Sequence, residues 1–226
     1  MKKFNKQTKQ PKKQGGRKEM AMDEKDKAKS AKLRAVMNGL RQLEKSTKKE
    51  GIAYVLGSKE IKPIESISTG SLMFDLALGI GGIPRGRVVE IFGPESSGKT
   101  LCAIKMAAEC QKMGGIVAFV DMEHTFDPTF SKKLGLEIDK GDVIISQPDH
   151  MQDAFNVIDK MIDAGVDLII LDSVAALVPK EELENEVGKQ NIGLVARYMS
   201  QFLRRITPKT TQNNSTVIMI EELMVV

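Results

Sequence analysis

The chemistry of this chain is concentrated in the stretch GPESSGKT, residues 93–100. Its spacing, G-x-x-x-x-G-K-[ST], predicts a loop whose glycines let backbone N–H groups point inward around the phosphates of a nucleotide. Lys99 would reach the β- and γ-phosphates, and the Thr100 hydroxyl would coordinate Mg²⁺. The residues expected to bind the nucleotide here are Gly93, Pro94, Glu95, Ser96, Ser97, Gly98, Lys99, Thr100 and Leu101.

Acidic residues stand at the ends of two apolar runs. The run DLIILD ends at Asp172, where a carboxylate can hold Mg²⁺, usually through water. The run in FVDMEH ends at Asp121 and leads to Glu123, which we expect to orient and deprotonate the attacking water. The ordinary alternative for Glu123 is a solvated loop acid. Because His124 and His150 have no partners at ligand spacing, we interpret both as structural.

The elements that must position these residues alternate between strands and helices. Strands are predicted for the short apolar runs RVVEIF, IVAFVD, DVIIS and DLIILD. Helices are predicted for STGSLMFDLALG, KTLCAIKMAAECQKMG and HMQDAFNVIDKMIDAG. Short apolar runs separated by helices predict an α/β fold with a parallel sheet covered on both faces. The phosphate loop follows one strand and opens a helix, which is the context that such a loop needs.

The positive charge of the chain belongs to its N-terminal tail. Residues 1–18 hold eight Lys or Arg and no acid, whereas the rest of the chain holds 26 basic and 30 acidic residues. With so few apolar residues, we expect residues 1–24 to form a disordered basic tail. The tail is either a solvated leader or a segment that attracts nucleic acid nonspecifically, in a strongly salt-dependent way.

A helix with one apolar stripe is predicted after the tail. Its members, spaced i, i+3, i+7 and i+10, are Leu33, Val36, Leu40 and Leu43. Such a stripe packs either on the core of its own chain or on a neighbouring subunit. We expect residues 25–58 to form this helix and a linker, and residues 59–226 to form the α/β core.

The composition favours a cytoplasmic protein without a membrane partner. No apolar run reaches the roughly 18 residues that a membrane span needs, and the N-terminus lacks the apolar core of a signal peptide. Cys102 and Cys110 lie eight residues apart in a predicted helix. They would be about 12 Å apart, too far for a disulfide, so we expect buried, reduced thiols.

Four segments together resemble the bacterial RecA recombinase family: ISTGSLMFDLALGIGGIPRGRVVEIFGPESSGKT, FVDMEHTFDP, IILDSVAALVPKEELENEVG and GLVARYMSQFLRRI. The likeness runs from about Lys25 to about Ile220, with several independent motifs in the right order. It implies a RecA-like P-loop ATPase core. It also implies a DNA-dependent ATPase of DNA recombination and repair, which forms helical filaments on single-stranded DNA and exchanges strands with homologous duplex. The expected location is the cytoplasm of a bacterial cell or a phage-infected host.

The resemblance also implies roles for single residues. Lys99 and Glu123 are the expected catalytic residues, and Asp172 is expected to help hold the Mg²⁺ of bound ATP. Asp127 and Phe130 would flank the adenine. The family usually has a tyrosine at the second of these positions, and phenylalanine keeps the stacking face.

The segment ENEVGKQNIG, residues 184–193, is similar to the first DNA-binding loop of the family. The residues that this likeness assigns to DNA binding are Gly188, Lys189, Asn191, Ile192, Gly193, Arg197 and Arg204. Without the resemblance, a polar loop between helices is an ordinary surface feature. The Leu33 stripe resembles the N-terminal helix that docks on the next subunit of the filament, so residues 25–58 are expected to serve oligomerisation.

The chain also departs from the family. Glu221 and Glu222 stand where the family has Asn-Gln, whose glutamine contacts the γ-phosphate. A carboxylate about 4 Å from that phosphate would be repelled by roughly 4 kcal/mol at an effective dielectric constant of about 20. The family's second DNA-binding loop, the basic residues that complete the neighbour's ATP site, a further strand and the C-terminal domain have no counterpart after Ile220. We therefore expect a C-terminally truncated chain from an interrupted reading frame, which a second polypeptide could complete.

Two classes of function remain open at this stage. The first is an enzyme, a RecA-type ATPase acting in recombination and repair. The second is a binding module, a truncated ATP-binding protomer that docks on or caps filaments without DNA-stimulated turnover.

Overall fold

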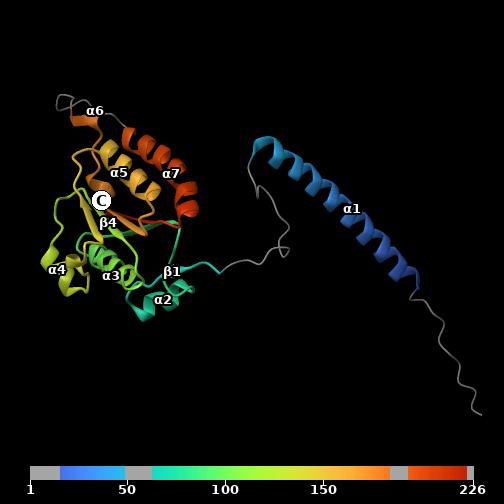
Figure 1. Cartoon of the computed structure of the whole chain (residues 1–226), viewed down its shortest axis with the longest axis horizontal. Helices are drawn as coiled ribbons and strands as arrows, with labels where there is room; N and C mark the ends of the chain where they lie inside the picture. The colour runs from blue at the N-terminus through green and yellow to red at the C-terminus, as the bar shows by residue number, and fades with distance from the viewer. Residues whose placement is uncertain (1–15, 49–62, 184–192, 223–226) are drawn as a thin grey trace, which may run out of the picture. The chain divides into compact units, whose positions relative to one another are not determined.

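The structure is a computed structural model that describes residues 16–48, 63–183 and 193–222 (Figure 1). The chain divides into two compact units, Met1–Lys62 and Pro63–Val226. The boundary predicted between residues 58 and 59 stays a prediction, because it lies outside the described residues.

The first unit contains one long helix, α1 (Gly16–Thr47). It includes residues 16–24, which the sequence assigned to a disordered tail, because Arg, Lys, Glu, Met and Ala dominate there and all favour a helix. Of the apolar stripe, Leu33, Val36 and Leu43 are 47%, 58% and 51% exposed. About half of this apolar surface is therefore uncovered.

The second unit is built on a parallel sheet. Its strands, in the order in which they pair, are β3 (Val88–Gly93), β7 (Thr216–Glu222), β6 (Leu168–Asp172), β4 (Val117–Asp121) and β5 (Val143–Ser146). A separate antiparallel pair is formed by β1 (Ser66–Ile67) and β2 (Ile83–Pro84). All of the neighbours in the larger sheet run parallel, so the predicted α/β class is confirmed.

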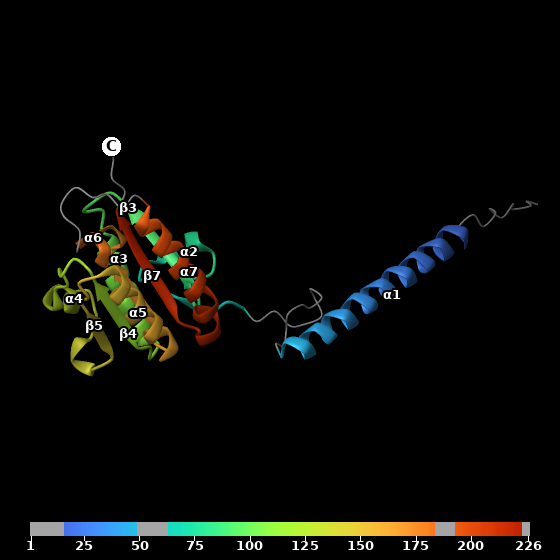
Figure 2. The same ribbon diagram turned by 90° about the horizontal axis from the view of Figure 1, so that it is seen from above.

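Helices cover both faces of this sheet (Figure 2). The helices are α2 (Leu72–Leu78), α3 (Lys99–Lys112), α4 (Pro128–Lys133), α5 (Met151–Asp163), α6 (Lys180–Leu183) and α7 (Leu194–Asn213), with 3-10 turns at η1 (Ile138–Lys140) and η2 (Val174–Ala176). Helix α3 packs on one face, whereas α5 and α7 lie side by side on the other. Among the described residues, no helix is both long and apolar enough to cross a membrane.

Alternation along the strands produces two separate cores. Phe119, Ile170 and Ile218 face the core that contains α3. Their neighbours Val120 and Leu171 face the core that contains α5 and α7. Because successive strand residues point to opposite faces, continuous apolar runs such as LIIL are what a strand buried on both sides requires.

The carboxyl ends of four parallel strands meet at one edge of the sheet. These strands end at Gly93, Asp121, Asp172 and Glu222. In open α/β sheets this edge is where ligands bind. Strand β3 is at one edge of the described sheet, and its residue Phe92 is 62% exposed.

Candidate functional site

The phosphate loop connects β3 to α3 at this edge. Gly98 has φ 90°, a left-handed conformation that a glycine adopts without strain, and it stands at the N-cap of α3. Gly93 is buried, and a Cβ there would lie 3.0 Å from Ser97 Oγ. Both motif glycines therefore have a local reason to be glycine: one for its backbone conformation and the other for close packing.

The Lys99 ammonium group is almost buried and folds back on the loop. Its Nζ donates to the carbonyl oxygens of Gly93 at 3.1 Å and Pro94 at 2.8 Å. It also lies 3.6 Å from Glu222 Oε1 at the end of β7. The lysine that the motif assigns to nucleotide phosphates is thus held here by carbonyl dipoles and one carboxylate.

Thr100 and Asp172 meet beside Lys99. Thr100 Oγ1 donates to Asp172 Oδ2 at 2.7 Å. Burial raises the pKa of Asp172, the hydrogen bond from Thr100 lowers it, and the nearby Glu123 and Asp121 carboxylates raise it again. The pKa therefore lies above its ordinary value, as expected for a crowded acidic corner that a cation would stabilise.

Glu123 reaches the same corner from the loop after β4. Its Oε1 accepts a short hydrogen bond from Ser173 Oγ, next to Asp172. The loop itself is held by Asp121, whose carboxylate is 4% exposed. This carboxylate accepts from Thr125 N, Phe126 N and Gln147 Nε2 at 3.2, 3.1 and 2.9 Å.

Asp121 and Ser173 are functional candidates that sequence reasoning missed. Asp121 was noted as the end of a strand, but its partners are other parts of the fold and cannot be read from spacing. Ser173 directly follows Asp172 in the LDS sequence, and this adjacency was the available signal. Asp121 accepts hydrogen bonds from the loop that follows Glu123, and Ser173 donates to the Glu123 carboxylate.

A cavity of about 220 Å³ lies where these groups converge. It is lined by Ser96, Ser97, Gly98, Lys99, Thr100, Glu123, Asp172, Ile220 and Glu222. Most of the predicted phosphate-binding residues therefore meet the predicted magnesium and catalytic residues. The other four predicted loop residues do not line this cavity: Gly93 is buried, and Pro94, Glu95 and Leu101 are exposed.

The two residues expected at the adenine, Asp127 and Phe130, also lie outside the lining of this cavity. Asp127 is the N-cap of α4, and its Oδ1 accepts from Thr129 N at 2.7 Å and from Phe130 N at 3.1 Å. Pro128 follows at the first helical position, a common helix start. Phe130 is 42% exposed, which leaves part of its ring accessible for stacking.

The predicted DNA-binding residues are only partly described. Gly188, Lys189, Asn191 and Ile192 lie outside the described residues. Gly193 is the N-cap of α7, and Arg197 and Arg204 are exposed on that helix. Because they are seven residues apart, the two arginines project from one face of α7.

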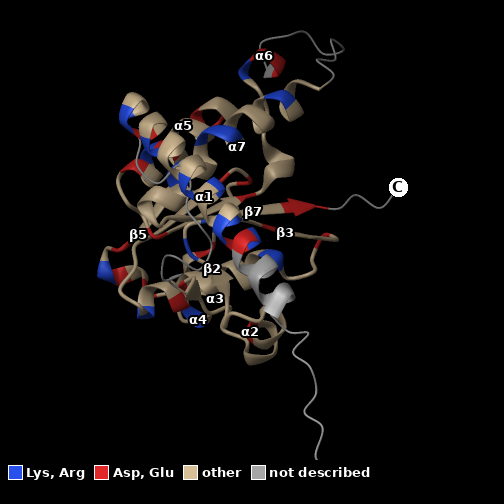
Figure 3. Ribbon diagram, turned by 90° about the vertical axis from the view of Figure 1, so that its right-hand side faces the viewer, with Lys and Arg blue, Asp and Glu red and all other residues tan. Residues whose placement is uncertain are grey.

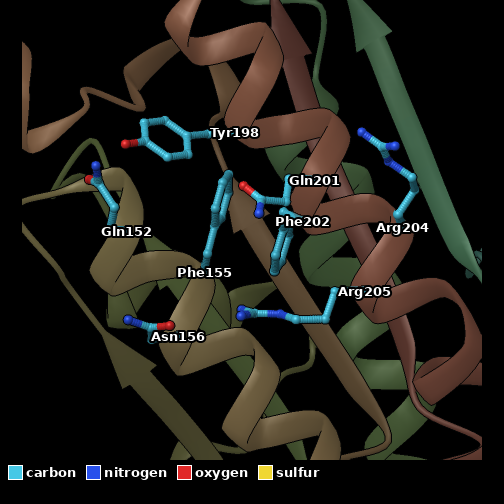
Figure 4. Close-up of a pocket in the computed structure, with 8 residues that line it drawn as sticks. All are labelled: Gln152, Phe155, Asn156, Tyr198, Gln201, Phe202, Arg204 and Arg205. Atoms are coloured by element: carbon cyan, nitrogen blue, oxygen red, sulfur yellow. The ribbon is translucent and has the colours of Figure 1, made fainter.

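Arg204 lines a second cavity, of about 580 Å³, between α5 and α7 (Figure 4). Phe155 and Phe202 stack within it, with ring centroids 3.9 Å apart and planes inclined by 3°. Arg205 Nε lies 3.6 Å from Asp159 on α5. Arg205 thus faces the neighbouring helix α5. Arg204 instead donates to Ser200 of its own helix.

The chemistry around the first cavity suits a magnesium-bound nucleotide. In the described residues, no side chain caps α3 at Gly98, so the first N–H groups of this 14-residue helix are available to phosphate oxygens. Thr100 and Asp172 supply the oxygen ligands that Mg²⁺ prefers. Glu222 is the exception, because it brings a negative charge to the same lysine.

A parallel sheet whose first strand leads through this loop into a helix defines the class of P-loop α/β proteins. A family model described as the RecA N-terminal domain matches residues 34–225. The chain belongs to the RecA family.

Curated relatives agree with this assignment. Protein RecA of Sulfurimonas denitrificans is 52% identical over 185 residues, which cover 81% of this chain and 53% of the relative. Protein RecA of Acinetobacter baylyi is 48% identical over 193 residues, covering 85% of this chain and 54% of the relative. Protein RecA of Wolinella succinogenes is 47% identical over 205 residues, covering 90% and 56%. The chain thus spans about half the length of these relatives, and nothing in the comparisons supports the expected second polypeptide.

Proposed function

We propose that this protein is a RecA-type recombinase. It binds ATP and Mg²⁺ at the phosphate loop, binds single-stranded DNA, and takes part in homologous strand exchange during recombination and repair in the bacterial cytoplasm. The observation that carries the proposal is the convergence of Lys99, Thr100, Asp172 and Glu123 on one cavity at the carboxyl edge of the sheet. Membership of the RecA family supplies the DNA chemistry.

Four residues of the cavity have a task in this proposal. Bound ATP supplies a phosphoanhydride bond, and its Mg²⁺ neutralises phosphate charge. Lys99 would bind the β- and γ-phosphates, while Thr100 Oγ1 would hold the metal ion together with Asp172, usually through water. Glu123, oriented by Ser173, accepts the proton of the attacking water.

The DNA-binding part of the proposal rests on α7 and the segment before it. Arg197 and Arg204 offer two positive charges on one face of the helix, which suit the phosphates of a DNA strand. The predicted residues 188–192 would extend this surface. Asp127 and Phe130 are proposed to flank the adenine, and the Leu33 stripe of α1 is proposed to join subunits.

A second function is favoured by one specific observation. The contact between Glu222 and Lys99 puts a carboxylate where a third phosphate would need the lysine. A protomer with this contact could bind nucleotide and dock on or cap filaments without DNA-stimulated turnover. The two functions share the nucleotide site and differ in hydrolysis.

The test is nucleotide binding followed by phosphate release. Lys99→Ala should weaken binding of ADP and ATP by about tenfold to a hundredfold, because a charge-assisted contact is lost. Lys112→Ala, in the last turn of the same helix, serves as the matched control and should bind normally. Equal affinities of Lys99→Ala and wild type would refute the site. Release of phosphate that single-stranded DNA accelerates several-fold identifies the enzyme, and release that DNA leaves unchanged identifies the binding protomer.

A further inference from the structure

The end of β7 places a carboxylate in the phosphate cavity. Glu222 Oε1 lies 3.6 Å from Lys99 Nζ, and both residues line the cavity of about 220 Å³. The lysine side chain is 7% exposed and that of Glu222 is 36% exposed. Figure 3 shows the acidic end of β7 in red. The contact therefore joins a nearly buried cation to an acid that solvent can still reach.

The sheet positions this carboxylate. Strands β3 and β7 pair in parallel, and the last pair in their register is Gly93 with Glu222. The residue that opens the phosphate loop is thus the direct neighbour of the acid. Residues Thr216–Ile220 of the same strand are buried, which fixes the strand in the sheet.

An opposite charge near Lys99 stabilises its ammonium group, because the side chain is nearly buried. A nearly buried ammonium group is costly unless it is paired, and carbonyl dipoles compensate it only in part. In the described part of the chain, Glu222 is the carboxylate within ion-pair distance of Lys99. A γ-phosphate would offer the same lysine another negative partner, and the two negative groups would then share one cation.

We propose that Glu222 makes this site select a nucleoside diphosphate over a nucleoside triphosphate. The proposal rests on the nucleotide site described under the proposed function. Besides its contact with Lys99, the β-phosphate is held by the N–H groups of the loop and the start of α3, which Glu222 does not occupy. The γ-phosphate must instead displace Glu222 from Lys99 or lie beside it. Glu222 is therefore a specificity-determining residue that penalises the third phosphate.

The experiment measures equilibrium binding of Mg²⁺-ADP and of a non-hydrolysable β,γ-imido analogue of ATP to the full chain. Wild type should bind ADP more tightly by about tenfold or more, since one like-charge contact of this kind is worth at least that factor. Glu222→Gln should raise the affinity for the ATP analogue by about the same factor and change that for ADP by less than about threefold. Glu221→Gln, one residue earlier on the strand and outside the cavity lining, is the control and should behave as wild type.

The outcomes separate this proposal from the proposed function. Equal binding of both nucleotides by wild type overturns the role of Glu222 and leaves the nucleotide site intact. An unchanged preference in Glu222→Gln does the same, provided that thermal unfolding shows a folded variant; Glu222→Ala replaces it if it does not fold. If wild type and both Gln variants bind neither nucleotide, the proposed function and this inference are both wrong.

Discussion

The substitution Asp121→Asn tests how the fold holds the loop that carries Glu123. Asp121 Oδ1 accepts from Thr125 N, and its Oδ2 accepts from Phe126 N and Gln147 Nε2. An asparagine has one acceptor oxygen, so its amide nitrogen must face one of these donors. The least costly orientation keeps the oxygen towards Phe126 and Gln147 and turns the amide towards Thr125.

The magnitude follows from these contacts. Losing one hydrogen bond to a buried charged acceptor costs about 1.5–3 kcal/mol, and the two that remain become weaker neutral bonds. The substitution also removes a repulsion, because the negative charge of Asp121 contributes to the raised pKa of Asp172. Relief of this repulsion offsets part of the lost stability. We expect a net loss of about 2 kcal/mol in the free energy of unfolding. For a unit of this size, that loss lowers Tm by about 4–8 °C.

The assay is thermal unfolding of the full chain followed by circular dichroism. The exposed residue Asp149 provides the control Asp149→Asn, which changes the same atoms at the surface and should leave Tm within about 1 °C of wild type. If Asp121→Asn unfolds at the same temperature as the control, the three hydrogen bonds do not stabilise the loop. Where nucleotide hydrolysis is measurable, the same variant should lose turnover more than nucleotide affinity, since the loop that carries Glu123 is displaced while the phosphate loop keeps its hydrogen bonds.

Two further predictions concern the apolar stripe and the edge of the sheet. Leu33→Ser with Leu40→Ser should weaken self-association by about tenfold or more in sedimentation, whereas Arg34→Ser on the same helix should not; unchanged sedimentation would contradict a role in assembly. Burial raises the pKa of Glu221, and a hydrogen bond with Glu90 and repulsion from it raise this pKa further. In the folded state the Glu221 carboxyl therefore keeps its proton to higher pH than in the unfolded state. The free energy of unfolding falls as pH rises from about 4.5 through the pKa of Glu221 in the folded state. Glu90→Gln should accordingly raise Tm at pH 7 but not at pH 4, and an equal Tm at pH 7 would refute the coupling.

Local sequence determined four of the five strands of the larger described sheet, namely β3, β4, β5 and β6, and the chemistry of the phosphate loop, whereas β7 was not predicted. The spacing of Gly93, Gly98, Lys99 and Thr100 identifies a loop because adjacent residues supply all of its donors. Apolar runs such as LIIL predict buried parallel strands, because a strand covered on both faces needs several consecutive apolar residues. The α/β class followed from these local signals. The N-terminal boundary of α1 did not, because charged helix formers suit a solvated helix as well as a tail.

Tertiary structure decided which distant residues meet at the site. Glu222 reaches Lys99 because β7 pairs with β3 in one particular register, and a shift of that register would move the carboxylate elsewhere. Asp121 holds the Glu123 loop partly through Gln147, which lies 26 residues away at the end of a neighbouring strand. Neither contact has a signature in sequence spacing. Each exists because parallel strands bring their carboxyl ends to one edge of the sheet, where groups that are far apart in the chain come within hydrogen-bonding or ion-pair distance.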